Sequence, residues 1–224
     1  ALSSAKGMDI KMKKKLALIL AGTAMAAMVL AGCGEKNNAS GEDVKTAESV
    51  EDKKTFTVGF DAEYPPYGYM DENGEYTGFD LELAEAVCKL EGWELVKKPL
   101  NWDSKDMELN SGSIDCIWNG FTMNGREEDY TFSTPYVDNS QVIVVAEKSG
   151  IDTLEDLAGK TVGVQAASAA LDLLQSEEEG GQKKLADTFG ALNEFADYNT
   201  AFTELQAGAL DALAIDVGVA NYQI

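Results

Sequence analysis

From residue 55 onward, short apolar runs alternate with segments of helical periodicity, and this alternation restricts the possible folds more than any other feature. Residues 56–60 alternate like a strand, and residues 79–90 repeat apolar side chains at helical spacing until Gly92 interrupts the pattern. Residues 141–146 form a continuous apolar run, which is typical of a strand buried on both faces. Strands that alternate with helices predict an α/β fold with mainly parallel sheets. The same patterns predict further strands at 93–96, 114–118, 161–164 and 210–215, and helices or helical turns at 107–109, 153–157, 167–174 and 202–208.

The first 54 residues have a different character. Four lysines between positions 11 and 15 precede the apolar run 16–30. A run of this length falls short of the ~20 apolar residues that a membrane-spanning helix needs. Residues 1–32 are therefore predicted to be an export signal with extra N-terminal residues, starting at Met8 or Met12. Residues 34–54 are polar and poor in large apolar side chains, which predicts a flexible stalk.

Residues 30–33 read Leu-Ala-Gly-Cys and resemble the lipobox of bacterial lipoproteins. The resemblance implies cleavage before Cys33 and acylation of its thiol. More than one acyl chain gives stable membrane attachment, so residues 33–54 would be a lipid-anchored stalk on the outer face of the cytoplasmic membrane. The alternative is an ordinary signal peptide in which Cys33 is incidental.

The charge of the remaining chain excludes one class of partner. Five of the 18 basic residues and one of the 39 acidic residues precede Cys33, which leaves 13 basic and 38 acidic groups and a net charge of −25. Such a surface repels nucleic acid. The chain has no histidine, so it lacks the usual general base and the commonest metal ligand, and we expect neither cofactor nor metal.

Two cysteines remain besides Cys33. Cys88 lies on the apolar face of a predicted helix, and Cys116 lies inside a strand-like run. Two buried thiols are the simpler interpretation. An oxidised pair stays open for an exported protein.

Several ordered motifs then carry a family resemblance. The heptad Gly-Phe-Asp-Leu-Glu-Leu-Ala at 78–84 resembles the signature of solute-binding proteins that serve polar-amino-acid ABC importers. The other segments that follow the family order are 61–67, 119–122, Arg126, 132–136, 159–165 and 211–216. Together these motifs extend over roughly residues 55 to 220.

The resemblance implies a periplasmic-binding-protein-like fold with two α/β lobes, a hinge of two crossing strands, and a ligand cleft between the lobes. Lobe 1 would span 55–140 and lobe 2 would span 141–216. Residues 217–224 would begin the return to lobe 1. Because the sequence ends at Ile224, we expect the rest of that return to be missing and the fold to be truncated at its C-terminus.

The resemblance also assigns residues to a zwitterionic ligand. Arg126, the only arginine, suits the α-carboxylate because its guanidinium is a planar, two-pronged donor. Thr122 would add a hydroxyl to the same carboxylate, although it lies four residues before the arginine where the family has five. The alternative for Arg126 is a surface ion pair with Glu127 or Glu128.

Two further residues are assigned to the polar groups of the ligand. Asp216 at the end of the last strand would accept a hydrogen bond from the α-ammonium of the ligand. The alternative is that Asp216 is simply a charged residue at the strand end. Ser168 precedes a helix whose free N–H groups would face the carboxylate. Ser168 would serve as the helix cap or as a ligand contact, and the family's second hydroxyl at this place is replaced by alanine.

Three residues are assigned to the ligand side chain. Tyr64 and Trp102 would sandwich it and offer a face to a cation, unless they belong to the core of lobe 1. Asp61 would contact its polar tip, whereas Glu63 is as well explained as a solvent-facing residue.

The resemblance therefore predicts a monomeric, non-enzymatic protein that captures a polar L-amino acid by cleft closure and delivers it to ABC transporter permease subunits. A prephenate or arogenate dehydratase on the same fold is the first alternative; one arginine and no histidine argue against it. An adhesin or sensor ectodomain is the second alternative, and it predicts no ligand-linked closure.

Overall fold

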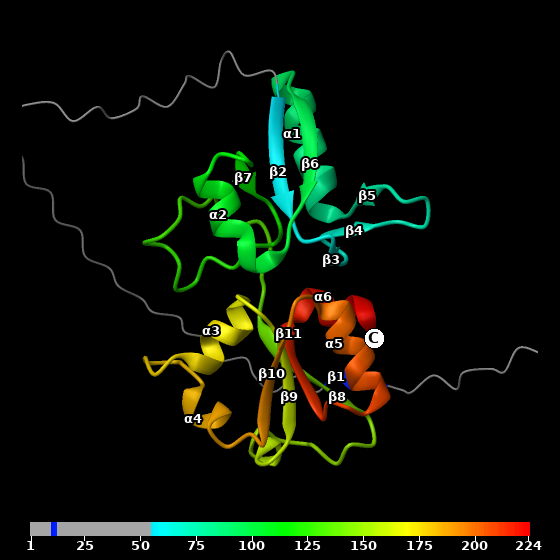
Figure 1. Ribbon diagram of the computed structural model, residues 1–224, viewed down its shortest axis with the longest axis vertical. Coiled ribbons are helices and arrows are strands. Elements are labelled where there is room, and N and C mark those ends of the chain that lie inside the picture. The colour runs from blue at the N-terminus through cyan, green and yellow to red at the C-terminus, as the bar shows by residue number, and fades with distance from the viewer. Residues whose placement is uncertain (1–9, 13–54) are drawn as a thin grey trace, which may run out of the picture.

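The computed structural model describes residues 10–12 and 55–224. These residues form two α/β bodies, one above the other in Figure 1. We call the body that contains β2 to β7 lobe 1 and the body that contains β8 to β11 lobe 2. The predicted lipobox with Cys33 and the predicted stalk lie outside the described residues. Of the predicted export signal, only the short strand β1 (Ile10–Met12) is described, and it pairs antiparallel with β8.

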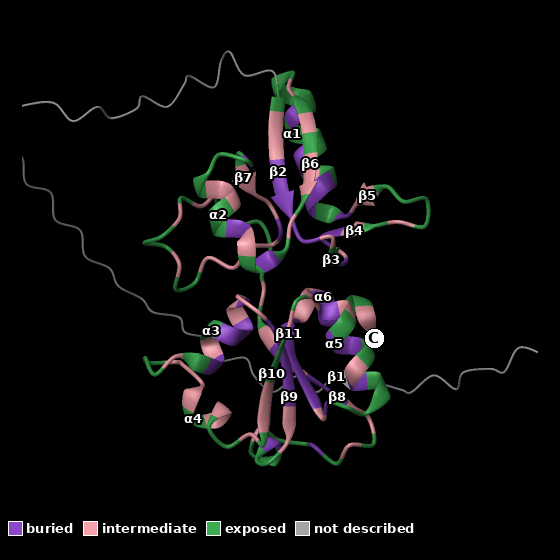
Figure 2. Ribbon diagram, in the orientation of Figure 1, coloured by how far each residue is buried: buried purple, intermediate pink, exposed green. Residues whose placement is uncertain are grey.

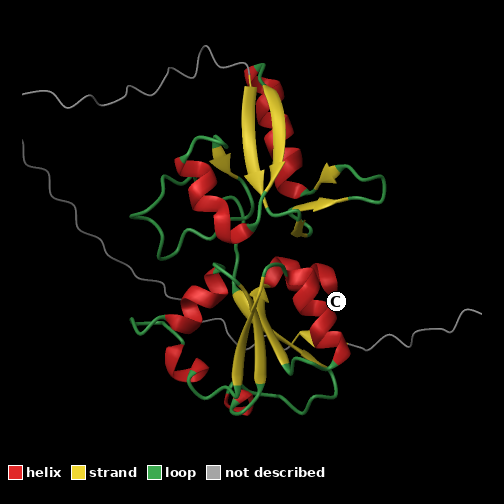
Figure 3. Ribbon diagram, in the orientation of Figure 1, coloured by secondary structure: helices red, strands yellow, loops and turns green. Residues whose placement is uncertain are grey.

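Lobe 1 is built around a three-stranded parallel sheet with the order β6-β2-β7. A small antiparallel sheet of β3, β4 and β5 extends from it (Figure 3). Helix α1 ends at Gly92, whose left-handed conformation (φ 71°) lets its N–H bond to the Cys88 carbonyl. The elements are β2 (Thr55–Phe60), β3 (Glu63–Tyr64), β4 (Gly68–Met70), β5 (Tyr76–Thr77), α1 (Phe79–Glu91), β6 (Glu94–Pro99), η2 (Trp102–Ser104), α2 (Lys105–Asn110) and β7 (Cys116–Ile117).

Lobe 2 contains a five-stranded sheet with the order β1-β8-β11-β9-β10. Strand β9 is parallel to β10 and β11, whereas β8 is antiparallel to β11. Helices α3 and α4 lie on one side of this sheet and α5 and α6 lie on the other (Figure 1). The elements are β8 (Gln141–Ala146), η3 (Glu155–Leu157), β9 (Thr161–Gln165), α3 (Ala169–Gln175), α4 (Lys183–Ala186), β10 (Ala191–Phe195), α5 (Tyr198–Ala207), β11 (Ala212–Asp216) and α6 (Val217–Gln223).

Burial follows this layering (Figure 2). One cluster of thirteen buried residues joins the lobe 2 sheet to α5 and α6, and a second cluster of ten joins the opposite face to α3. The first cluster also contains Tyr64 and Tyr67 from lobe 1, so the two lobes share apolar packing. Within lobe 1, the buried cluster has only four members: Val58, Phe60, Leu81 and Ala84.

The predicted α/β fold is confirmed, and each predicted strand and helix overlaps an observed element. The predicted helix at 167–174 begins two residues later than expected. Ala167 has φ 53°, and Ser168 is extended, so that its hydroxyl oxygen accepts from the Leu171 N–H. The cap therefore keeps both residues out of the helix.

Cys88 and Cys116 are both present as thiols; Cys88 is buried and Cys116 is half-buried. Helix α6 covers the stretch expected to begin the return to lobe 1. It packs on lobe 2 through Val219 and Ala220, and its Tyr222 ring lies 6.0 Å from the ring of Tyr69 in lobe 1. In the part of the chain that the structure describes, no helix is long and apolar enough to cross a membrane.

Candidate ligand-binding cleft

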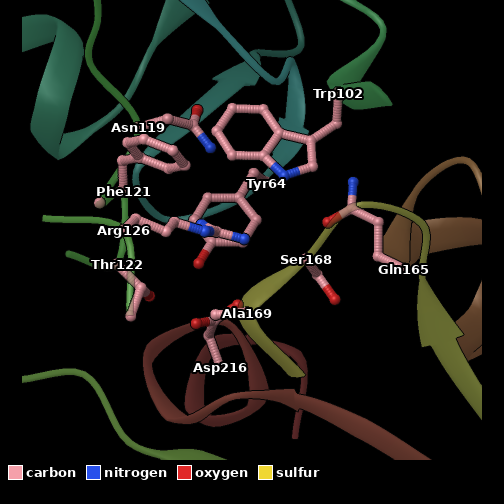
Figure 4. A pocket seen from close by; sticks show the side chains of 11 residues that line it. Tyr64, Trp102, Asn119, Phe121, Thr122, Arg126, Gln165, Ser168, Ala169 and Asp216 are labelled. Carbon is pink, nitrogen blue, oxygen red and sulfur yellow. The ribbon is translucent and has the colours of Figure 1, made fainter. Parts of the chain in front are cut away.

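A hollow lies between the two lobes (Figure 4). Its wall comes from both lobes: Tyr64, Trp102, Asn119, Gly120, Phe121, Thr122, Arg126, Gln165, Ser168, Ala169 and Asp216. Strands β7, β9 and β11 all end beside it, because residues 119–122, Gln165 and Asp216 are at or just beyond their carboxyl ends. In α/β sheets, ligands bind outside the carboxyl ends of the strands.

The structure brings six of the seven predicted site residues to this hollow. They are Tyr64, Trp102, Thr122, Arg126, Ser168 and Asp216. Asp61 does not line it. Asp61 is nonetheless buried next to the wall, because its Oδ2 accepts a hydrogen bond of 2.6 Å from Nε2 of Gln165, which does line the hollow.

Arg126 lines the hollow, and its side chain is 12% exposed. Its Nη2 atom is 2.6 Å from Oδ2 of Asp172 and 3.4 Å from the carbonyl oxygen of Ala167, both in lobe 2. The guanidinium carbon lies 4.8 Å from the centroid of the Phe121 ring. Among the described residues, the ion-pair partner is therefore Asp172 rather than the neighbouring Glu127 or Glu128 of the alternative interpretation.

Asp216 and Thr122 are joined through Asn139. The amide nitrogen of Asn139 donates to Oγ1 of Thr122 at 3.3 Å and also to Oδ1 of Asp216. Gln141 donates to the same Oδ1 atom at 2.6 Å. The Oδ2 atom is 3.5 Å from the Tyr198 hydroxyl, and this long contact leaves it better placed than Oδ1 to accept from a ligand ammonium.

The structure confirms the helix cap predicted for Ser168, and the ligand contact stays a prediction. Its hydroxyl oxygen caps α3, and the residue lines the hollow together with Ala169. The capping bond uses the oxygen as an acceptor.

The aromatic residues form an apolar wall. Tyr64 is 5% exposed and stacks on Tyr67 at a centroid distance of 5.4 Å, and burial raises the pKa of its hydroxyl well above the ordinary value. Trp102 is 7% exposed and meets the Phe121 ring edge-on at 5.6 Å. Each of these side chains therefore contributes to packing and to the wall of the hollow at once.

Burial raises the pKa of Asp61 to about 6, despite the hydrogen bonds from the Glu63 N–H and from Gln165. Asp61 faces a second, more open hollow that it shares with Glu63 and residues 99–101. Glu63 is exposed, as its alternative interpretation expected, and it accepts a hydrogen bond from Asn199 of lobe 2.

Five residues of the wall were not predicted as site residues: Asn119, Gly120, Phe121, Gln165 and Ala169. Four of them lie within a segment that carried the family resemblance, and Ala169 directly follows Ser168. Asn119 also has a structural task, because its Oδ1 atom accepts from the Asp61 N–H at 2.9 Å. Their position next to Thr122 and Ser168 in the sequence is the signal that could have identified them.

Comparison with known proteins agrees with this geometry. The family model for bacterial extracellular solute-binding proteins, family 3, matches residues 56–216. The L-cystine-binding protein TcyJ of Escherichia coli (strain K12) is 32% identical over 195 residues, which cover 86% of this chain and 69% of that protein. The arginine-binding extracellular protein ArtP of Bacillus subtilis (strain 168) is 34% identical over 212 residues, which cover 94% of this chain and 75% of ArtP.

A solved structure supports the same conclusion. The substrate-binding protein of an ABC uptake transporter from Streptococcus pneumoniae, solved with bound histidine, superposes with a TM-score of 0.71 and 36% identity. The match covers 76% of this chain and 69% of that chain. These relatives are binding proteins rather than enzymes, and the family is extracellular, which supports a role in binding outside the cytoplasm. The chain belongs to the bacterial extracellular solute-binding proteins of family 3.

Proposed function

We propose that this protein captures a polar L-amino acid in the cleft, closes its lobes around it, and delivers it to the permease of an ABC importer. One observation carries the proposal: a cationic fork, a hydroxyl, a buried carboxylate and two aromatic faces line the same hollow. A zwitterion needs a donor for its carboxylate and an acceptor for its ammonium. Arg126 and Thr122 supply the first, and Asp216 supplies the second.

The rest of the arrangement fits this role. Tyr64 and Trp102 would hold the ligand side chain, Ser168 would donate to the carboxylate, and Asp61 would act through Gln165 at the polar tip. Residues 55–140 and 141–216 would be the two moving lobes of a monomer. Closure is the useful step, because only the closed form buries the charges of the ligand and presents both lobes to a transporter.

Thermal melts in the presence of L-cystine and of each of the twenty amino acids test the proposal. A ligand that binds only the folded state raises stability by ~2.7 kcal/mol at a hundredfold excess over its dissociation constant. We expect a shift with one or a few polar amino acids; L-cystine, L-arginine and L-histidine come first, because the relatives bind them. A folded protein whose melting temperature does not shift with any amino acid would contradict the proposal.

Substitution of Arg126 tests its assignment. Arg126→Ala should weaken binding by about 2–5 kcal/mol, because it leaves a buried carboxylate unpaired. That corresponds to roughly 30-fold to several-thousand-fold in affinity. Titration calorimetry measures the change. Lys183→Ala is the matched control, because it removes a partly exposed cation of lobe 2 that pairs with Asp187 and does not line the hollow. A loss below threefold in Arg126→Ala would reject the assignment.

Membrane attachment is a separate part of the proposal. We infer that Cys33 carries the lipid that anchors the protein to the outer face of the cytoplasmic membrane. Cys33→Ser should then move the protein from the membrane fraction to the soluble fraction of expressing cells, without changing amino-acid binding. Retention of Cys33→Ser in the membrane fraction would reject the lipid anchor and leave the binding function untouched.

A further inference from the structure

Three polar contacts tie one side of lobe 1 to the beginning of α3 in lobe 2. Arg126 pairs with Asp172 at 2.6 Å, and the same Nη2 atom lies 3.4 Å from the carbonyl oxygen of Ala167. The Nζ atom of Lys105 lies 3.4 Å from that carbonyl oxygen as well. Two cationic groups from lobe 1 therefore meet at a single carbonyl of lobe 2. We call Arg126 and Asp172 the interlobe ion pair.

The interlobe ion pair is located beside the hollow rather than inside it. Arg126 lines the hollow, but Asp172 does not, and the Asp172 side chain is 58% exposed. Both contacts of the guanidinium with lobe 2 use Nη2, so the N–H groups of Nε and Nη1 are not used by either of them. A carboxylate in the hollow could accept from one of these N–H groups while Asp172 stays bound to Nη2. Asp172 is thus placed to act together with a ligand, not to compete with it.

The charges explain why such a pair would matter. Lys105 is only 4% exposed, and burial lowers the pKa of its ammonium. Arg126 is nearly as buried and lies on the face of Phe121. Cations taken out of water need anions for compensation. Asp106 and Asp103 of lobe 1 act on Lys105. Asp172 of lobe 2 is in ion-pair contact with Arg126, and a ligand carboxylate would be a further anion.

We propose that Asp172 is a positioning residue for ligand binding, which holds the lobes closed through Arg126 and thereby slows release of the bound amino acid. The proposal rests on the proposed function of the cleft. Because Asp172 bonds to the arginine only across the lobes, its contribution exists in the closed form and is absent from the open form. Its removal should therefore change the rate of release and leave the rate of association nearly unchanged.

The first test compares Asp172→Asn with Asp187→Asn. Asp187 pairs with Lys183 at the same distance of 2.6 Å and is similarly exposed at 61%, but both partners of that pair belong to lobe 2. Stopped-flow measurements with the polar amino acid that gives the largest melting shift yield both rate constants. We expect Asp172→Asn to raise the dissociation rate about two- to fivefold, with association within twofold of the wild type. Asp187→Asn should change neither rate.

The salt dependence of the dissociation rate is a further measurement, which a merely structural role of Asp172 would not affect. In 1 M NaCl, the difference in dissociation rate between the wild type and Asp172→Asn should shrink toward none, because mobile ions screen the partly exposed pair. Unchanged or slower dissociation in Asp172→Asn would overturn the proposal. Slower dissociation would identify Asp172 instead as a competitor of the ligand carboxylate.

The second test needs no ligand, so it separates failure of this inference from failure of the proposed function. Spin labels at the exposed positions Asn110 of α2 and Gln175 of α3, in a chain whose three cysteines are replaced by serine, report the distance between the lobes. We expect Asp172→Asn to shift the distance distribution of the ligand-free protein toward longer values, and Asp187→Asn to leave it unchanged. Coinciding distributions for all three proteins would overturn the proposal, whether or not any amino acid binds.

Discussion

The two lobes are built from similar strands and helices, but they differ in how many apolar residues they bury. The sheet of lobe 2 has helices on both sides, and lobe 2 supplies eleven of the thirteen buried residues of one cluster and all ten of the other. The cluster of lobe 1 has four, and lobe 1 also carries exposed apolar side chains such as Leu90 (84% exposed) and Met107 (65%). Because buried apolar area supplies most of the stability of a domain, lobe 2 should have the larger free energy of unfolding.

This difference matters for the cleft, because lobe 1, which has the smaller buried core, supplies most of the wall of the cleft. Tyr64, Trp102, Arg126 and residues 119–122 all belong to lobe 1. A ligand that bridges the lobes would therefore raise the free energy of unfolding of lobe 1 more than that of lobe 2, because most of the residues that it would contact belong to lobe 1. Hydrogen exchange resolves the two lobes separately and can test the comparison.

Core truncation should have the largest effect. Leu213 in lobe 2 and Leu81 in lobe 1 are both fully buried. Leu213→Ala should lower the free energy of unfolding of lobe 2 by about 3–5 kcal/mol, and Leu81→Ala should cost lobe 1 about 2–3 kcal/mol, because the smaller cluster relaxes more easily around the cavity. Exchange rates of amides in β9 and β2 measure the two losses. An equal or larger loss for Leu81→Ala would remove the contrast between the lobes.

Acidity should affect lobe 1 next. Asp80 is fully buried in α1, and burial raises its pKa to about 6, although the Tyr136 hydroxyl donates to it at 2.8 Å. A carboxyl with a raised native pKa binds its proton more tightly in the folded state than in the unfolded state. The Asp80 carboxyl therefore makes the free energy of unfolding decrease as the pH rises from about 4 to about 6.

Asp80→Asn should remove this fall, which is roughly 2 kcal/mol between pH 4 and pH 7. Denaturant unfolding at several pH values measures it. Asp71→Asn is the control in the same lobe, because the Glu75 N–H lowers the pKa of Asp71 and its contribution is lost as the pH falls. If Asp80→Asn keeps the pH dependence of the wild type, the source of that dependence lies elsewhere.

The smallest effect concerns the loop of lobe 2 beside the cleft. Ala167 has a left-handed backbone (φ 53°), which is costly for a residue with a side chain. Ala167→Gly should therefore stabilise lobe 2 by about 0.5–1 kcal/mol, whereas Ala166→Gly next to it should cost a similar amount. Thermal melts of the two variants give the comparison. A loss of stability in both variants would show that no strain is stored at Ala167.

The sequence allowed the main elements to be predicted where the apolar pattern was strong. The continuous run of β8 and the alternating run of β2 were clear, because their side chains are sorted by burial. Strand β10 was not predicted, since its residues are half-buried or exposed at the edge of the sheet and include Asn193 and Glu194. Helix α4 has no buried residue and gave no apolar pattern either.

The candidate site likewise contains residues that could be predicted from the sequence and contacts that could not. Arg126 could be predicted from its chemistry and its motif, but its partner could not. Asp172 is 46 residues away, in the other lobe, whereas Glu127 and Glu128 are adjacent in the sequence. The hydrogen bond between Gln165 and Asp61 spans 104 residues and is equally hidden. Contacts between lobes depend on how the two bodies pack, which local patterns do not encode.

Arg126 is the only arginine of the chain and lies where the two lobes and the hollow meet. Protein grown with nitrogen-15-labelled arginine would therefore give a single set of guanidinium signals in a magnetic resonance spectrum. Those signals need no assignment, since they have only one possible origin. The same residue that joins the lobes is thus a built-in spectroscopic reporter, whose hindered rotation and proton shifts would record whether the guanidinium is bound to Asp172, to a carboxylate in the hollow, or to both.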